Sequence, residues 1–219
     1  MHDLVCLHAA ASGPATWDQV VPGLTGLGYR VHCPPLLGHL DAERRRRYPL
    51  TAFRDDVLRE LDERGLDRVT LVGHSLGGYV ASLVASAAPD RVARLVLEEM
   101  PVPPRNSGDA PASRKQAGAA AMRVFAFLNR KKCDPALFRE VVAAFREPQP
   151  QWWDDLPAIT AGTLVLAGGG RSHLDQSRYE LFVRSVPGAA VVTVPAGHRI
   201  HHHAPERWLA AVSGFLAPV

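Results

Sequence analysis

The chain has 219 residues, of which 47% are hydrophobic and 21% charged, and its formal net charge is +3. These values fit one globular domain with a sizeable core, and they exclude a disordered, collagen-like or coiled-coil chain. No apolar run is long enough to span a bilayer and no basic-then-apolar leader opens the chain, so we expect a cytoplasmic protein with no membrane partner.

Short apolar runs alternate with helical patterns along most of the chain. We expect six strands, at 3–8, 29–34, 67–73, 92–99, 163–170 and 189–197. We expect helices over 17–28, from Leu50 with Thr51 as N-cap, over 76–89, and around 175–186 and 205–216. Strands that alternate with helices need crossover connections, so the pattern predicts an α/β fold with a mainly parallel sheet and helices on both faces.

One segment, 101–157, has no strand pattern. It opens with a proline-rich loop and then predicts two helices, around 114–130 and 135–146. We interpret it as a helical cap inserted into a core formed by residues 1–100 and 158–219. The segment holds nine basic and six acidic residues, an excess that we interpret as a solvated surface rather than as a sign of polar or anionic substrates. Its aromatic residues either line an acyl pocket or form the core of the cap: Phe125, Phe127, Trp152 and Trp153.

The sequence Gly-His-Ser-Leu-Gly at 73–77 follows a strand pattern and precedes a helix pattern. A sharp turn at this place forces the two backbones close together, so its flanking positions must be small. The turn would hold Ser75 clear of its neighbours at the carboxyl end of the sheet, where open α/β sheets bind ligands. We therefore predict that Ser75 is a nucleophile, the alternative being an incidental serine in a packing turn.

A serine hydroxyl needs a base and, for acyl chemistry, donors for an oxyanion. His198 directly follows the last predicted strand in a glycine turn, and we predict that it is the base. The expected oxyanion donors are the backbone N–H groups of Leu76 and Ala10. The consecutive histidines 201–203 point in different directions and are poor ligands for one ion, so we expect no metal site.

The carboxylate that orients the base has two candidates. Glu99 ends the fourth predicted strand, and Asp175 lies beyond the fifth, where a helical cap is its ordinary role. We favour Glu99. By strand alternation Glu98 points to the opposite face, where we expect a surface acid. We interpret His8, which ends the first strand, as a residue that positions the adjoining loop.

Neither the cysteines nor the one basic run indicates special chemistry. We expect the three cysteines to be reduced and structural: Cys6, Cys33 and Cys133. The four arginines at 44–47 lie in a long polar turn, and we interpret them as a solvated loop rather than a nucleic-acid site.

These motifs together resemble the α/β-hydrolase family along nearly the whole chain. The matching stretches are "LHAAASGPATW" at 7–17, "GH" at 38–39, "GHSLGG" at 73–78, and "AGHRIH" at 196–201 with "PERW" behind it. The order serine, carboxylate, histidine is that of the family. Two departures are that the family usually has two further strands before the first one here, and that Ala9 replaces a usual glycine.

The resemblance implies cofactor-free hydrolysis of an ester, thioester, amide, lactone or C–C bond. The main hypothesis is a serine hydrolase of esterase type that acts on a small-molecule acyl substrate through Ser75, His198 and Glu99. The alternatives are an acyltransferase or a cofactor-free haloperoxidase-like enzyme on the same residues, or a non-catalytic ligand-binding protein that keeps the fold.

Overall fold

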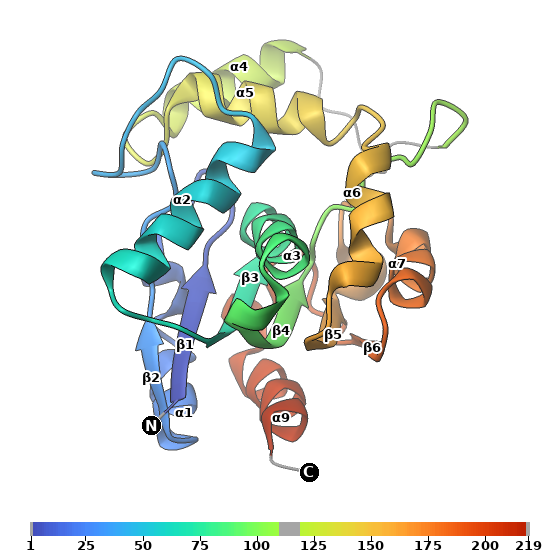
Figure 1. Cartoon of the computed structure of the whole chain (residues 1–219). Helices are drawn as coiled ribbons and strands as arrows, with labels where there is room; N and C mark the ends of the chain where they lie inside the picture. The colour runs from blue at the N-terminus through green and yellow to red at the C-terminus, as the bar shows by residue number, and fades with distance from the viewer. Residues whose placement is uncertain (1, 110–118, 218–219) are drawn as a thin grey trace.

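The computed structural model describes residues 2–109 and 119–217, which form a six-stranded sheet with the strand order β2-β1-β3-β4-β5-β6 (Figure 1). Every neighbouring pair of strands is parallel. The strands are β1 His2–Leu7, β2 Tyr29–His32, β3 Val69–His74, β4 Val92–Glu98, β5 Gly162–Ala167 and β6 Ala189–Thr193. The predicted fold class and the six parallel strands are confirmed.

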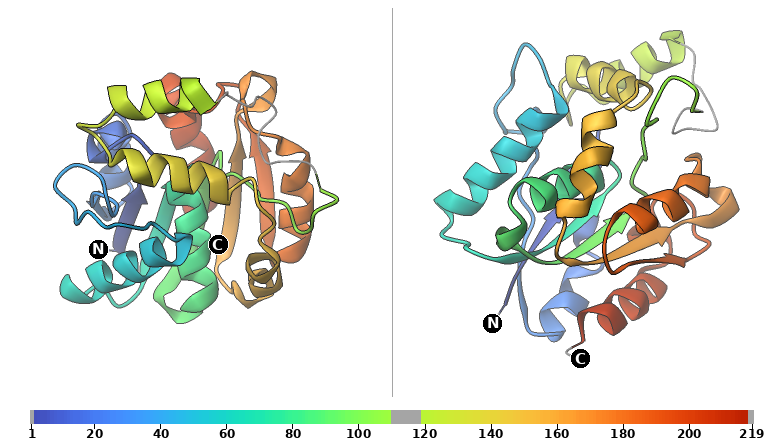
Figure 2. Two further views of the ribbon diagram at one scale, coloured as in Figure 1. Left: turned by 90° about the horizontal axis from the view of Figure 1, so that it is seen from above. Right: turned by 45° about the vertical axis from the view of Figure 1, so that its right-hand side comes forward.

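Helices cover both faces of this sheet (Figure 2). One face carries α1 Val21–Gly26 and α9 Pro205–Leu216, and the other carries α2 Leu50–Glu63, α3 Leu76–Ala87, α6 Pro150–Asp155 and α7 Tyr179–Ser185. Each face has its own hydrophobic core, and the central strands feed both because successive side chains alternate. On β4, for example, Leu95 and Leu97 enter the first core and Val96 enters the second.

Two further helices, α4 Ala119–Leu128 and α5 Pro135–Ala144, lie over the carboxyl ends of the strands (Figure 1). The start of the predicted helix at 114–118 lies outside the described residues. Asp134 caps α5 by accepting the N–H of Ala136 at 2.8 Å, and Leu137 and Val141 bury the inner side of the helix. Together α4 and α5 form a roof over the end of the sheet at which the catalytic residues were predicted.

Helix boundaries differ from the prediction at three places. The predicted helix at 17–28 is a 3-10 turn, Pro14–Trp17, followed by the short α1. Thr51 is not the N-cap of α2. The N-cap is Pro49, whose backbone is extended (φ −61°, ψ 144°), and the helix begins at Leu50. The helix α6 was not predicted, since six residues between prolines are too short to show a helical period.

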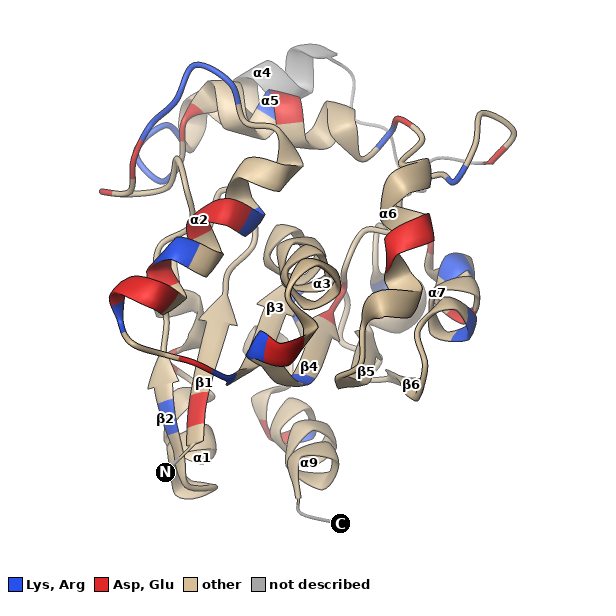
Figure 3. Cartoon of the chain, in the orientation of Figure 1, with Lys and Arg blue, Asp and Glu red and all other residues tan. Residues whose placement is uncertain are grey.

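The outer side of α2 alternates basic and acidic residues (Figure 3). Arg59 pairs with Glu63 at 3.0 Å and Arg64 pairs with Glu60 at 2.6 Å, the i,i+4 spacing that stabilises exposed helices slightly. Among the described residues, none of the helices has both the length and the apolar character needed to cross a bilayer.

Candidate active site

The turn between β3 and α3 consists of a single residue, Ser75. Its backbone (φ 53°, ψ −114°) occupies a region that residues with a side chain rarely adopt. A Cβ added to Gly73 would lie 2.3 Å from the Gly77 carbonyl oxygen, and one added to Gly77 would lie 2.1 Å from that of Leu7. Both glycines are therefore required by the close passage of strand and helix, as the sequence predicted for this turn.

Ser75 opens into a cavity of about 640 Å³ between the strand ends and the roof formed by α4 and α5. His198, Leu76 and the loop after β1 also line it, which brings the predicted base and both predicted oxyanion donors to the same space as Ser75. The roof contributes mainly apolar side chains: Phe125, Phe138, Val141, Val142 and Phe145.

The imidazole of His198 faces the carboxylate of Glu99. The Nδ1 atom of His198 lies 3.3 Å from Oε2 of Glu99, whose side chain is fully buried. Glu99 follows β4 directly and has a positive φ of 48°, a second strained backbone position beside the cavity. With Nδ1 turned to the carboxylate, Nε2 is the nitrogen left to exchange a proton with a substrate or a nucleophile.

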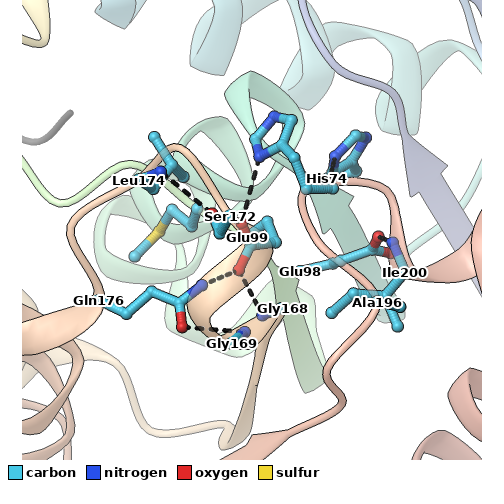
Figure 4. Close-up of polar contacts among 12 residues, drawn as sticks. His74, Glu98, Glu99, Gly168, Gly169, Ser172, Leu174, Gln176, Ala196 and Ile200 are labelled. Atoms are coloured by element: carbon cyan, nitrogen blue, oxygen red, sulfur yellow. Dashed lines mark hydrogen bonds and ion pairs between the residues drawn. The ribbon is translucent and has the colours of Figure 1, made fainter. Parts of the chain in front are cut away.

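Three further groups donate to the carboxylate of Glu99 (Figure 4). The N–H of Gly168 donates to Oε1 at 2.5 Å, and the side-chain amide of Gln176 donates to the same oxygen. The hydroxyl of Ser172 donates to Oε2. These hydrogen bonds satisfy the buried carboxylate of Glu99 and fix its position beside His198. Asp175 instead caps the 3-10 turn Gln176–Arg178, where it accepts the N–H of Ser177 at 3.1 Å.

The prediction that Glu98 is a surface acid is wrong, because its side chain is fully buried. It does point away from Glu99 (Figure 4). That side is covered by the short α8 Ile200–His203 and by α9, both of which contact Glu98. Its carboxylate accepts the N–H of Ile200 at 2.6 Å, Nδ1–H of His201 at 2.8 Å and the indole N–H of Trp208 at 2.9 Å. Two consecutive carboxylates, Glu98 at the end of β4 and Glu99 just after it, thus contact His201 in α8 and His198 just before α8.

His74, in the Gly-His-Ser-Leu-Gly sequence at 73–77, holds the segment that contains His198 from the other side. Its Nε2–H donates to the carbonyl oxygen of His198 at 2.6 Å, and its ring lies 4.9 Å from the rings of both His198 and His201. Burial lowers the pKa of His74 well below 6.5, so the ring is neutral. Sequence reasoning missed His74 and the Glu98–His201 pair; the acid doublet at the end of a buried strand was the available signal.

We expect Glu98→Ala to lower the free energy of unfolding by about 3 kcal/mol or more, because it leaves His201 and several other buried donors without their acceptor. Urea unfolding of the variant measures this loss. Glu63→Ala, which removes an exposed acid of α2, is the control and should cost less than about 1 kcal/mol. Equal losses for the two variants would contradict the assignment of Glu98 as a structural anchor.

The loop after β1 is positioned by two buried histidines whose rings meet edge to face, 4.7 Å apart. His8 accepts the N–H of Leu36 at 3.0 Å, and His39 accepts the N–H of Ala11, which has a φ of 56°, at 3.2 Å. These contacts agree with the interpretation of His8 as a loop-positioning residue; the role of His39 was not predicted. Beside them, the N–H of Leu76 lies in the first turn of α3 and has no partner within the helix.

Stability should fall on acidification because burial lowers the pKa of His8 to about 3 and that of His39 to about 4. Between about pH 6.5 and pH 4 the unfolded chain binds these protons and the folded chain does not, so stability is lost as the pH falls through this window. Each histidine contributes a slope of up to about 1.4 kcal/mol per pH unit. Urea unfolding at pH 7 and pH 5 measures the slope, which His39→Gln should reduce and His2→Gln, at an exposed position, should leave unchanged.

The aromatic residues singled out in segment 101–157 have different surroundings. Phe125 lines the cavity and packs against Phe138 at 4.7 Å. Trp152 and Trp153 lie instead in the hydrophobic core, 3% and 4% exposed, and do not line the cavity. Trp152 donates to the hydroxyl of Ser82 at 2.9 Å, which fixes α6 against α3. Phe127 is largely exposed.

His173 is a cavity residue that sequence reasoning did not single out. Its ring meets that of His198 edge to face at 4.2 Å. Burial lowers the pKa of His173 to about 4, so it stays neutral at pH 7 and places no positive charge beside His198. It follows Ser172 in the turn after β5, where the sequence offers no acid.

The chain has relatives along nearly its whole length. A profile of the alpha/beta hydrolase family matches residues 4–212. Esterase YbfF from Escherichia coli is 27% identical over 77% of this chain and 74% of that protein. The sn-1-specific diacylglycerol lipase ABHD11 from Mus musculus is also 27% identical, over 98% of this chain and 80% of that protein. A hydrolase from Pseudomonas aeruginosa has a TM-score of 0.78 at 25% identity, over 99% of this chain and 90% of that one.

Proposed function

We propose, from the premise that this chain belongs to the alpha/beta hydrolase family and is a hydrolase enzyme, that it cleaves a carboxylic ester or related acyl substrate through Ser75, His198 and Glu99. The observation that carries the proposal is the pairing of His198 with Glu99, at the wall of the cavity into which the strained Ser75 opens.

The reaction proceeds in two halves. The hydroxyl oxygen of Ser75 attacks the substrate carbonyl while Nε2 of His198 takes the proton. The tetrahedral oxyanion accepts hydrogen bonds from the backbone N–H groups of Leu76 and Ala10. His198 then protonates the leaving alcohol as the C–O bond breaks. Water, deprotonated by His198, attacks the acyl-enzyme and releases the acid. Glu99 holds the imidazole in place and stabilises its charged form.

Residues 101–157 act as the cap of this site, and the remaining residues form the hydrolase core. The position of α4 and α5 over the strand ends, with the apolar side chains of α5 turned to the cavity, supports this division. An apolar roof excludes water from the acyl group, which strengthens the hydrogen bonds to the developing oxyanion.

A fluorophosphonate probe tests the proposal. We expect one adduct per chain, found on the peptide that contains Ser75 by mass spectrometry. An adduct on another residue, or none, would overturn the assignment. Product analysis on an ester that is turned over, with and without an added alcohol, separates hydrolysis from acyl transfer: free acid in both reactions supports hydrolysis, and a new ester as main product supports transfer.

A further inference from the structure

The wall of the active-site cavity carries three cationic side chains and, within the described part of the chain, no carboxylate. The cations are Lys132, Arg146 and Arg199. The one nearby acid that belongs to the site, Glu99, lies behind His198 and is occupied by its own donors. The cavity therefore offers positive charge to whatever it binds.

The cations lie on two segments of the cavity wall. Lys132 precedes α5 and Arg146 follows it, so the two flank the helix that forms most of the roof. Their backbones are fixed, since the N–H of Lys132 donates to Asn129 at 2.8 Å and that of Arg146 donates to Ala143 at 3.0 Å. Arg199 directly follows His198, and its Nη2 lies 3.4 Å from Nε2 of His203.

These cations differ from the arginines of the chain that pair with neighbouring acids. Arg45, Arg59 and Arg64, for example, each contact a carboxylate at 3.0 Å or less. Among the residues that the structure describes, no ion pair involves Lys132, Arg146 or Arg199. Their charges remain available to a ligand.

Apolar surface lies along the same roof. Phe138, Val142 and Phe145 of the α5 region line the cavity together with the two cations that flank the helix. A ligand held at Ser75 and under this roof would pass apolar side chains before it leaves the cavity past Lys132 or Arg146. The same ligand would then gain binding free energy from burial of its apolar chain and from an ion pair at its end.

We propose that the enzyme selects esters that carry an anionic group, such as a carboxylate, separated from the scissile carbonyl by an apolar segment. This inference rests on the proposed function and adds its substrate class. The anionic group can belong to the acyl part or to the alcohol part; the chemistry of recognition is the same, and the test separates the two.

The test compares monomethyl and dimethyl esters of the same straight-chain dicarboxylic acid. We expect kcat/KM for the monoester to exceed that for the diester by on the order of 10-fold at low salt, the size that a few exposed ion pairs supply. The advantage should shrink as salt is raised to about 0.5 M, because salt screens exposed charges. A second pair of esters, with the carboxylate on the alcohol part or absent, shows which side of the substrate is recognised.

Variants connect the preference to the named side chains. The double variant Lys132→Gln, Arg146→Gln should reduce the monoester-to-diester ratio several-fold, and Lys132→Glu should reduce it further. Arg139→Gln, which removes an exposed arginine of α5 that does not line the cavity, should keep the wild-type ratio. A ratio near one in the wild type, or equal ratios in the double variant and Arg139→Gln, would overturn the proposal.

A binding measurement keeps the substrate class separate from the chemistry. Calorimetric titration with the monoamide and the diamide of the same dicarboxylic acid compares an anionic and a neutral ligand without turnover. Tighter binding of the monoamide, lost in the double variant, supports the anion site even if no ester is cleaved. Turnover of both esters at equal rates, blocked by the fluorophosphonate, would leave the proposed function standing and remove the substrate class.

Discussion

Replacing Ser75 with alanine is expected to lower ester turnover by roughly 10⁴- to 10⁶-fold, because the variant has no hydroxyl to form the acyl-enzyme. The fold should survive. Alanine keeps the Cβ that serine already places at φ 53°, so the substitution adds no new backbone strain. Steady-state kinetics on an ester that the wild type turns over measures the loss, and thermal unfolding verifies that the variant is folded.

Two comparisons make this result specific. Ser213→Ala, at an exposed serine of α9 that bonds to the Ala210 carbonyl, should keep wild-type turnover. His198→Ala should be about as damaging as Ser75→Ala, because a nucleophile and its base act as a unit. A Ser75→Ala variant that keeps more than a few per cent of wild-type turnover would contradict the nucleophile assignment.

The sharp turn at Ser75 and the sheet were predictable because their determinants are local. The apolar runs were long enough to mark all six strands, and Gly73 and Gly77 are required by contacts that any strand–turn–helix of this sharpness creates. The place of His198 followed from topology, since the carboxyl ends of parallel strands meet at one edge.

The surroundings of the two acids were not predictable, because they depend on contacts between segments far apart in the sequence. Glu98 was expected at the surface because nothing in its neighbourhood indicates that α8 and α9 cover that face. Its partners Ile200, His201 and Trp208 lie more than 100 positions further along the chain. Trp152 illustrates the same limit: its partner Ser82 is 70 positions away, and its aromatic character alone did not separate core from pocket.

Glu98 and Glu99, at the end of β4, together hold the segment that carries His198. Glu98 is the last residue of β4 and Glu99 follows the strand with a positive φ, and their side chains reach opposite sides of the segment that follows β6. Glu98 fixes the backbone at residues 200–201, and Glu99 faces the ring of His198. Glu99 has a strained φ of 48°, and it lies where the chain leaves β4 and enters the candidate active site.

Glu99→Gln is expected to lower turnover by about 10²- to 10⁴-fold with little change in fold, and the hydrogen bonds explain why an isosteric change is so damaging. Glutamine has one acceptor oxygen where glutamate has two. The N–H of Gly168 cannot move, so that oxygen should stay with Gly168. The new amide N–H₂ group then faces Nδ1 of His198, which must become the acceptor. The proton moves to Nε2, the nitrogen that has to accept one from Ser75.

Asp175→Asn is the matched control for this prediction, since it makes the same chemical change in the other candidate acid. Asparagine can still accept the N–H of Ser177 and cap the 3-10 turn, so we expect less than about a 10-fold effect on turnover. Both variants are compared by kcat and by thermal unfolding, because a positioning defect lowers kcat without a matching loss of stability. A larger loss of turnover in Asp175→Asn than in Glu99→Gln would reverse the assignment, because the orienting carboxylate would then come from the loop after β5.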